Sequence, residues 1–177
     1  PLPAESRSFH YGDDTHVVTV SRDLVTLGYH AMTDSSAPRT LADHPQLLEA
    51  VHLSLSPHRV GVFRTAPGVT AAAAAAVLRA EPGIRFARPA YHLGDPNHPH
   101  SLNILTEDFC VGLPSGSDAE ALATSLGAVV IRSFAFPGTW QMRLVTDDDR
   151  DPITVCEDLL ATGTVTFAHP DWLRYLG

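Results

Sequence analysis

The sequence lacks long apolar runs. The run at residues 71–78 is short and mostly alanine, whereas a membrane-spanning helix needs about 20 apolar residues. The first 14 residues also lack a basic segment followed by an apolar core, which is the pattern of a signal peptide. We therefore expect no membrane partner, and a cytoplasmic location is favoured over a secreted one.

Cysteine and positive charge are both scarce. Cys110 and Cys156 are the two cysteines, and two isolated cysteines do not make a disulfide framework, so we interpret both as buried free thiols. The chain has 12 Lys and Arg residues and 20 Asp and Glu residues, which gives a net charge of -8. Such a chain lacks the clustered positive charge on which nucleic-acid binding depends, which excludes nucleic acid as the expected partner.

A short pattern occurs twice in the chain. "IRFARPAYH" (84–92) and "VTFAHPDWL" (165–173) both contain Phe-Ala, a basic residue, Pro, one further residue and an aromatic residue. The preceding segments also align, with Leu78 matching Leu159. An internal repeat predicts two similar structural units, and we interpret each pattern as the closing strand of its unit, ended by the proline.

The second half gives the clearer signals. Alternating apolar residues predict strands, and capping residues bracket the helices. Ser117 with Glu120 forms a capping box, while Asp151 with Pro152 begins a second helix that Gly163 ends. The predicted order is strand 107–113, helix from Ser117 to Gly127, strands 128–134 and 140–145, helix 151–163 and strand 164–168.

The first half predicts the same order with weaker signals. Asp43 and Gln46 are placed to cap a helix that carries Leu47, Leu48 and Val51. The remaining predicted elements are strand 23–29, two strands around the turn at 56–59, helix 69–80 and strand 84–87. Residues 16–20 add an edge strand or a hairpin.

The order strand-helix-strand-strand-helix-strand predicts an α+β fold of two tandem ferredoxin-like (βαββαβ) units, each an antiparallel sheet with helices on one face. Loop composition sets the predicted boundaries. They are an N-terminal tail at 1–15, a first unit at 16–91, a linker at 92–103, a second unit at 104–171 and a C-terminal tail at 172–177.

Residues 104–173 resemble the N-terminal prodomains of subtilisin-like serine proteases. The resemblance lies in "ILTEDFCVGLPSGSDAEALATSLGAVVIRSF", "WQMRLV" and "DPITVCEDLLATGTVTFAHPDWL". The first half matches in outline, through "FHYGDD", "DLVTL" and "GIRFARPAYH". These are strand and cap patterns rather than catalytic signatures.

The resemblance implies a propeptide that serves as an intramolecular chaperone and inhibitor of its protease. Its sheet would pack on the catalytic domain, in cis or in trans, and its tail would lie in the active-site cleft as an added strand. The residues that would bind the partner are then Trp172, Leu173, Arg174, Tyr175, Leu176 and Gly177. For Trp172, packing over the edge of the core is the favoured alternative.

The catalytic motifs of a subtilase are missing from the sequence. "DTH" at 14–16 lacks the glycine of the aspartate motif, and no histidine is followed by Gly-Thr. We therefore predict no enzymatic activity and no cofactor. His92, His98 and His100 lie close in sequence, but their spacing matches no zinc pattern, so no metal site is predicted.

Two other functions stay open on the sequence alone. One is a stand-alone protein-binding adaptor that uses a free sheet face. The other is a small-molecule-sensing regulatory module with tandem ferredoxin-like units, because "GLPSGSDAEAL" (112–122) fits the turn after the first strand of such modules. A sensor would be stabilised by a metabolite, whereas an inhibitor would block a protease through its tail.

Overall fold

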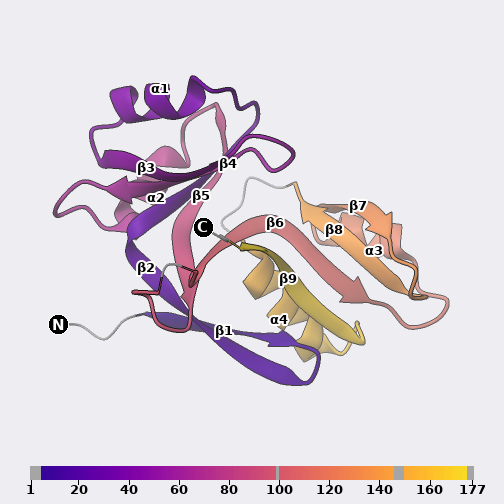
Figure 1. The fold of residues 1–177 in the computed structure, drawn as a ribbon. Coiled ribbons are helices and arrows are strands. Elements are labelled where there is room, and N and C mark those ends of the chain that lie inside the picture. Colours follow the sequence, from indigo (N-terminus) through magenta and orange to yellow (C-terminus); the bar gives the residue numbers. More distant parts are fainter. Residues whose placement is uncertain (1–4, 99, 146–149, 175–177) are drawn as a thin grey trace. The chain divides into compact units, whose positions relative to one another are not determined.

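The structure is a computed structural model that describes residues 5–98, 100–145 and 150–174 (Figure 1). Contacts divide the chain into two compact units. Within the described residues, unit 1 comprises residues 5–6, 19–104 and 174. Unit 2 comprises residues 7–18 and 105–173. Unit 2 therefore includes an N-terminal segment that residues 19–104 separate from the rest of it.

Unit 1 packs two helices on a four-stranded sheet with the strand order β3-β4-β2-β5, in which β4 is antiparallel to β3 and β2. Val25 and Leu27 alternate with Thr26 along β2 and bury their side chains in a core with Phe63. Ala74 and Leu78 of α2 complete that core. The elements are β2 (Asp14–Tyr29), α1 (Ser36–Asp43), β3 (Leu47–Ser54), β4 (Val60–Thr65), α2 (Ala71–Leu78) and β5 (Ile84–Leu93).

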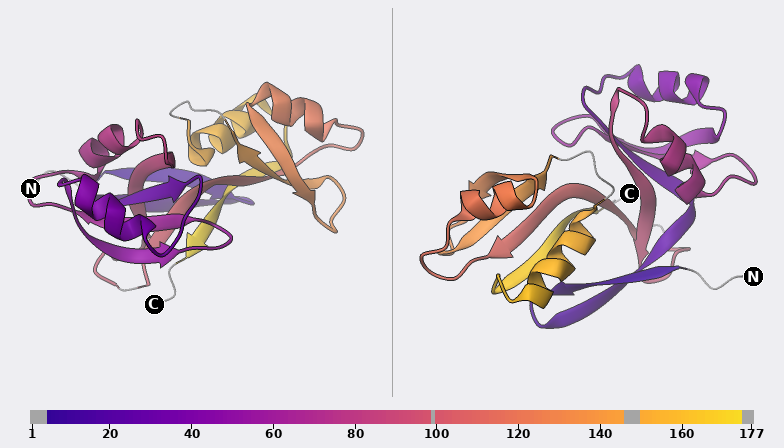
Figure 2. Two further views of the ribbon diagram at one scale, coloured as in Figure 1. Left: turned by 90° about the horizontal axis from the view of Figure 1, so that it is seen from above. Right: turned by 180° about the vertical axis from the view of Figure 1, so that it is seen from behind.

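Unit 2 has the strand order β7-β8-β6-β9 and places both of its helices on one sheet face (Figure 2). Phe109 and Val111 of β6 lie in one core with Ala123 of α3 and with Val155 and Leu159 of α4. Its elements are β1 (Ser6–Tyr11), β6 (Leu102–Gly112), α3 (Ala119–Ser125), β7 (Ala128–Ser133), β8 (Thr139–Leu144), α4 (Pro152–Thr162) and β9 (Phe167–Arg174).

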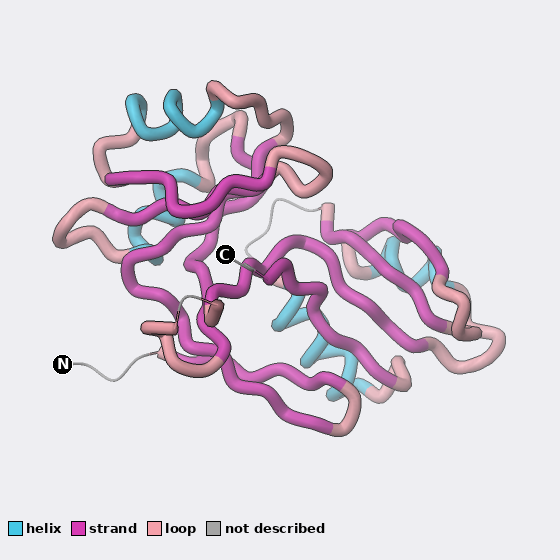
Figure 3. The backbone as a smooth tube through the Cα atoms, viewed as in Figure 1, coloured by secondary structure: helices cyan, strands magenta, loops and turns pink. Residues whose placement is uncertain are grey.

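The predicted fold of two tandem ferredoxin-like units is wrong. The described residues form one nine-stranded, mostly antiparallel sheet with four helices, not two separate sheets. The physical reason is the length of two strands (Figure 3): β2 has 16 residues and β6 has 11, and each runs from one unit into the other. β5 and β6 also pair directly, with Tyr91 opposite Asn103, so strands enter both ends of the predicted linker at 92–103.

One predicted helix is also wrong. Leu47, Leu48 and Val51 lie in β3, while α1 comes earlier, at Ser36–Asp43. β3 pairs with β4, and Leu47 lies opposite Thr65. Pairing with a buried neighbouring strand outweighs the local capping signal, since tertiary packing routinely overrides helix propensity.

The helix caps of unit 2 are partly as predicted. Asp118, not Ser117, caps α3, because its carboxylate accepts a hydrogen bond from the backbone N–H of Ala121 at 3.0 Å. Asp151 caps α4 as predicted and accepts from the N–H of Thr154 at 3.0 Å. Gly163 ends α4 in the left-handed conformation at φ 69°, which glycine adopts without steric cost.

The repeated Phe-Ala pair packs alike in both units. Ala87 and Ala168 point into the two cores, so the preceding phenylalanines lie on the opposite sheet face. There each ring covers a glycine of another strand, Gly28 of β2 in unit 1 and Gly112 of β6 in unit 2. A Cβ added at Gly28 would lie 2.3 Å from Cε1 of Phe86, and one at Gly112 would lie 2.3 Å from Cε1 of Phe167.

The basic residue of the pattern lies against the same phenylalanine ring. The Arg88 guanidinium lies 4.5 Å from the Phe86 ring centroid, and the rings of Phe167 and His169 stack at 5.9 Å. The predicted role of the prolines is wrong, because β5 continues beyond Pro89 and β9 beyond Pro170. A strand tolerates a proline at a position whose backbone N–H is not needed for a hydrogen bond to a neighbouring strand.

None of the helices in the described part of the chain is long and apolar enough to cross a membrane.

The glycine contact generates a stability prediction. Gly28→Ala would force a methyl group into the buried Phe86 ring, and overpacking of this kind costs about 1–3 kcal/mol. We expect the free energy of unfolding, measured by chemical denaturation, to fall by that amount. Adding Phe86→Leu should recover part of the loss, because the two sites are coupled.

Gly83→Ala is the matched control, because a Cβ there would meet nothing within 4 Å. It should leave stability unchanged to within about 0.5 kcal/mol. Equal effects of the two glycine substitutions would contradict the proposed contact.

Candidate functional site

The predicted partner-binding residues fall into two groups. Trp172, Leu173 and Arg174 form the end of β9 and do not belong to a separate tail. Tyr175, Leu176 and Gly177 lie outside the described residues. Within unit 2 the Trp172 ring lies 5.3 Å from the ring of Phe9, so Trp172 packs against the N-terminal strand.

A connected set of polar side chains crosses the sheet face of unit 2 that points away from α3 and α4. We call this set the polar cluster, and it consists of Asp108, Arg132, Gln141, Arg143 and Asp171. Alternation places these residues opposite the core, since their strand neighbours Phe109 and Met142 lie in it. The polar cluster draws on all four strands, β7, β8, β6 and β9.

Arg143 and Asp108 form the ionic part of the polar cluster. They are directly opposite each other on β8 and β6, and the guanidinium donates from Nε at 2.6 Å and from Nη2 at 2.9 Å to the two carboxylate oxygens. This two-point geometry is among the stronger ion pairs in proteins. The hydrogen bonds to Asp108 raise the pKa of the Arg143 guanidinium.

Gln141 joins the ion pair to the last strand. Its amide nitrogen donates to Asp108 at 3.2 Å and to Asp171 of β9 at 2.9 Å, while its oxygen accepts from Nε of Arg132 at 2.8 Å. A nearly buried amide that satisfies three charged partners fixes their relative positions. β9 is therefore held to the sheet by side chains as well as by its pairing with β6.

Cys110 lies within the polar cluster, directly opposite Gln141. Burial, reinforced by the Asp171 and Asp108 carboxylates, raises the pKa of its thiol to about 11. Burial likewise raises the pKa of Cys156, which lies in the core. Both cysteines are free and buried, as predicted. A protonated, enclosed thiol is a poor nucleophile, so the polar cluster organises the sheet rather than presenting a reactive sulfur.

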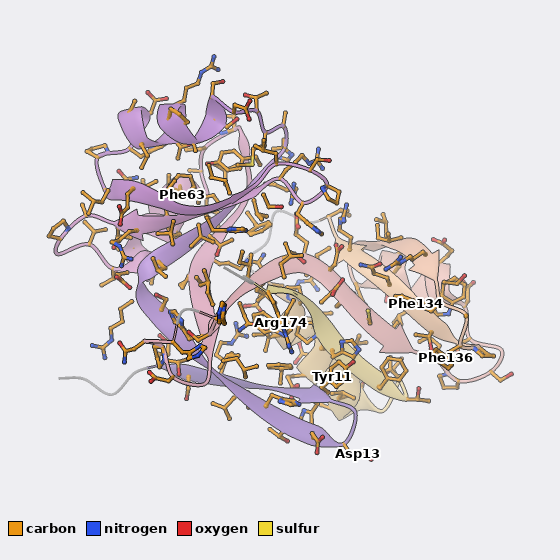
Figure 4. The ribbon with its side chains drawn as sticks, viewed as in Figure 1. Tyr11, Asp13, Phe63, Phe134, Phe136 and Arg174 are labelled. Carbon is orange, nitrogen blue, oxygen red and sulfur yellow. The ribbon has the colours of Figure 1, made fainter. Side chains whose placement is uncertain are left out.

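Apolar side chains are exposed along β7 and the turn that follows it. Val129, Ile131 and Phe136 are 42%, 41% and 77% exposed, and Figure 4 labels Phe134 and Phe136 at this turn. β7 is the last strand in the sheet order, and a bulge between Val130 and Arg132 interrupts its pairing with β8. Bulges of this kind limit unwanted strand addition at an edge. The edge at β7 therefore presents its exposed side chains more than its backbone hydrogen-bonding groups.

The histidines at 92, 98 and 100 do not gather around one point. His92 contacts the Ser101 hydroxyl at 2.9 Å, while the rings of His98 and His100 lie 5.5 Å apart. Among residues 5–98, 100–145 and 150–174, no three His, Cys, Asp or Glu side chains are placed to hold a metal ion.

Sequence reasoning missed the polar cluster. Its signal was present, because Asp108 and Cys110 on one strand and Gln141 and Arg143 on another alternate with core residues. Alternation alone predicts a solvated face. The cross-strand register that turns these side chains into one network cannot be read from the spacing.

The ion pair generates a prediction. Arg143→Met keeps the apolar stem but leaves the nearly buried Asp108 carboxylate without its guanidinium. We expect the free energy of unfolding to fall by about 1–2 kcal/mol, because a nearly buried carboxylate loses its charged partner and keeps only the Gln141 hydrogen bond. The exposed Arg39 of α1 offers the control Arg39→Met, and an equal loss in both variants would contradict this role of Arg143.

The raised pKa values of the Cys110 and Cys156 thiols predict low reactivity in the folded chain. At pH 8 neither cysteine should react with iodoacetamide in the native chain, whereas both should react in denaturant, as counted by mass spectrometry. The Cys110 pKa rises from 9.0 to about 11 on folding, so the stability that this thiol contributes is present below pH 9 and lost as the pH rises through 11. Rapid native labelling of Cys110 would show that the site is open.

No family model matches this chain, and no curated protein and no solved structure matches it either. The resemblance to subtilase prodomains therefore rests on the sequence motifs of residues 104–173 alone.

Proposed function

We propose that this chain is a non-catalytic, prodomain-like module of a subtilisin-like serine protease, acting as a folding chaperone, an inhibitor or both. The sequence motifs of residues 104–173 support this function. The structural observation on which it depends most is that β9 stays extended up to Arg174 and is tied to β6 and β8 through Asp171 and Gln141. A fixed, extended strand is the form in which a polypeptide enters a protease cleft.

In this proposal the residues after Trp172 carry the cleft interaction. Trp172 packs on Phe9 within unit 2, which makes it a support for the strand rather than a side chain for a protease pocket. Leu173 is half-buried and Arg174 is exposed. The contact with the cleft would thus begin at Leu173 or Arg174 and continue through Tyr175, Leu176 and Gly177.

The catalytic domain would also need a broader contact with the sheet. The exposed apolar residues Val129, Ile131 and Phe136 supply such a surface, since apolar side chains grouped at a surface favour protein association. The charges of the polar cluster are largely balanced by its own ion pair and hydrogen bonds. If the catalytic domain covered the polar cluster, no unpaired charge would be buried.

The inhibition assay tests this proposal. The full chain should slow the hydrolysis of a chromogenic peptide by a subtilisin-type protease, but not by a chymotrypsin-type protease. Deleting residues 175–177 should weaken inhibition about tenfold or more, which corresponds to 1.4 kcal/mol of lost binding. This deletion spares β9 and the contact between Trp172 and Phe9.

Phe136→Ser is the companion variant, because it changes the exposed apolar surface and leaves the C-terminus intact. It should weaken inhibition without making the chain a faster substrate. If the full chain inhibits none of a panel of subtilisin-type proteases, or if the shortened chain inhibits equally well, the proposal is wrong.

A further inference from the structure

The N-terminal hairpin belongs to unit 2 although it is far away in sequence. Residues 7–18 carry most of β1, the turn and the start of β2. Within unit 2, Phe9 and Val18 are 6% and 1% exposed. Burial to this extent shows that the hairpin is packed into unit 2. The prediction of an N-terminal tail at 1–15 is therefore wrong for the hairpin residues up to 15.

Polar contacts connect the hairpin to α4. Arg7 binds the Asp151 carboxylate through both terminal nitrogens and donates to the Thr154 hydroxyl at 3.0 Å. One turn further along the helix, the Glu157 carboxylate accepts from the backbone N–H of His10 at 3.1 Å and contacts its Nδ1 at 3.0 Å. The hairpin thus binds the first half of α4 at two successive turns.

Aromatic contacts connect the same hairpin to β9. The Phe9 ring lies 5.3 Å from Trp172, and the Tyr11 ring lies 4.5 Å from His169. His16, from the second strand of the hairpin, stacks on Phe9 at 5.4 Å. Tilted and stacked aromatic pairs at these distances each add to stability beyond the area that they bury.

β9 is therefore held by two independent sets of contacts. On β6 and β8, backbone pairing and the polar cluster hold it through Asp171. The hairpin holds it through His169 and Trp172. The second set consists of side-chain contacts between two segments that residues 19–104 separate in the sequence. Contacts of this kind can open locally while the sheet stays folded.

We infer that the N-terminal hairpin, residues 7–18, is a clasp that holds β9 in its extended position within unit 2. When the clasp is closed, β9 is preorganised, and a preorganised strand loses less conformational entropy on binding. When it is open, β9 fluctuates at its C-terminal end. The effect on inhibition rests on the proposed function, whereas the effect on β9 does not.

Arg7→Met/Tyr11→Ala opens the clasp by removing the Arg7 contacts with Asp151 and Thr154 and the Tyr11 ring contacts with His169 and His16. It leaves the Asp151 cap of α4 intact. Hydrogen–deuterium exchange of the full chain should then accelerate about tenfold or more in β9, as expected for the loss of the Arg7 ion pair and the Tyr11 ring contacts. Exchange in β8 should not change. Arg39→Met is the control and should alter neither strand.

Trp172 gives a second readout. In a Trp140→Phe background it is the remaining tryptophan, and opening the clasp should shift its fluorescence emission to longer wavelength. Glu157→Gln, a milder change at the other polar contact, should give a smaller shift in the same direction. Unchanged β9 exchange and emission would overturn the inference, and so would acceleration of β8 equal to that of β9.

The inhibition assay separates this inference from the proposed function. If the wild-type chain inhibits, the clasp variant should inhibit more weakly at equal concentration, and undiminished inhibition would contradict preorganisation. If the wild-type chain does not inhibit, the proposed function fails, while the exchange and fluorescence results still decide whether the clasp exists.

Discussion

Each unit depends on one close contact between a phenylalanine and a glycine of another strand. Phe86 of β5 lies on Gly28 of β2, and Phe167 of β9 lies on Gly112 of β6. A side chain at either glycine would occupy the space of the ring, so the phenylalanine ring can lie there only because the glycine has no Cβ. The alanine after each phenylalanine turns into the core, and the following basic residue stacks on the ring. The repeated pattern is thus one packing solution used twice.

In unit 2 the contact between Phe167 and Gly112 is one of three that hold β9 in place. Phe167 fixes one end of β9 against β6, Asp171 meets Gln141 further along, and Trp172 meets Phe9 near the other end. Each contact uses a different kind of interaction, namely close packing, hydrogen bonding and aromatic contact. Together they keep the strand extended up to Arg174, which is the feature that the proposed inhibitory role requires.

The sequence allowed prediction where local chemistry decides structure. Asp151 and Gly163 delimit α4 because capping is a short-range effect. The same local reasoning failed at Leu47–Ser54, where pairing with β4 produces a strand. It could not foresee that β2 and β6 run through both units, nor that Arg7 meets Asp151, because contacts between residues so far apart depend on the assembled fold. The polar cluster was missed for the same reason.

The most direct measurement is hydrogen–deuterium exchange of the full chain with and without a subtilisin-type protease whose catalytic serine has been replaced by alanine. If unit 2 binds the protease through its sheet and its last strand, exchange should slow in β9 and in the segment from β7 to β8, which carries Val129, Ile131 and Phe136. Exchange in β3 and β4 of unit 1 should change little. Protection confined to unit 1, or no protection at saturating protease, would contradict the account.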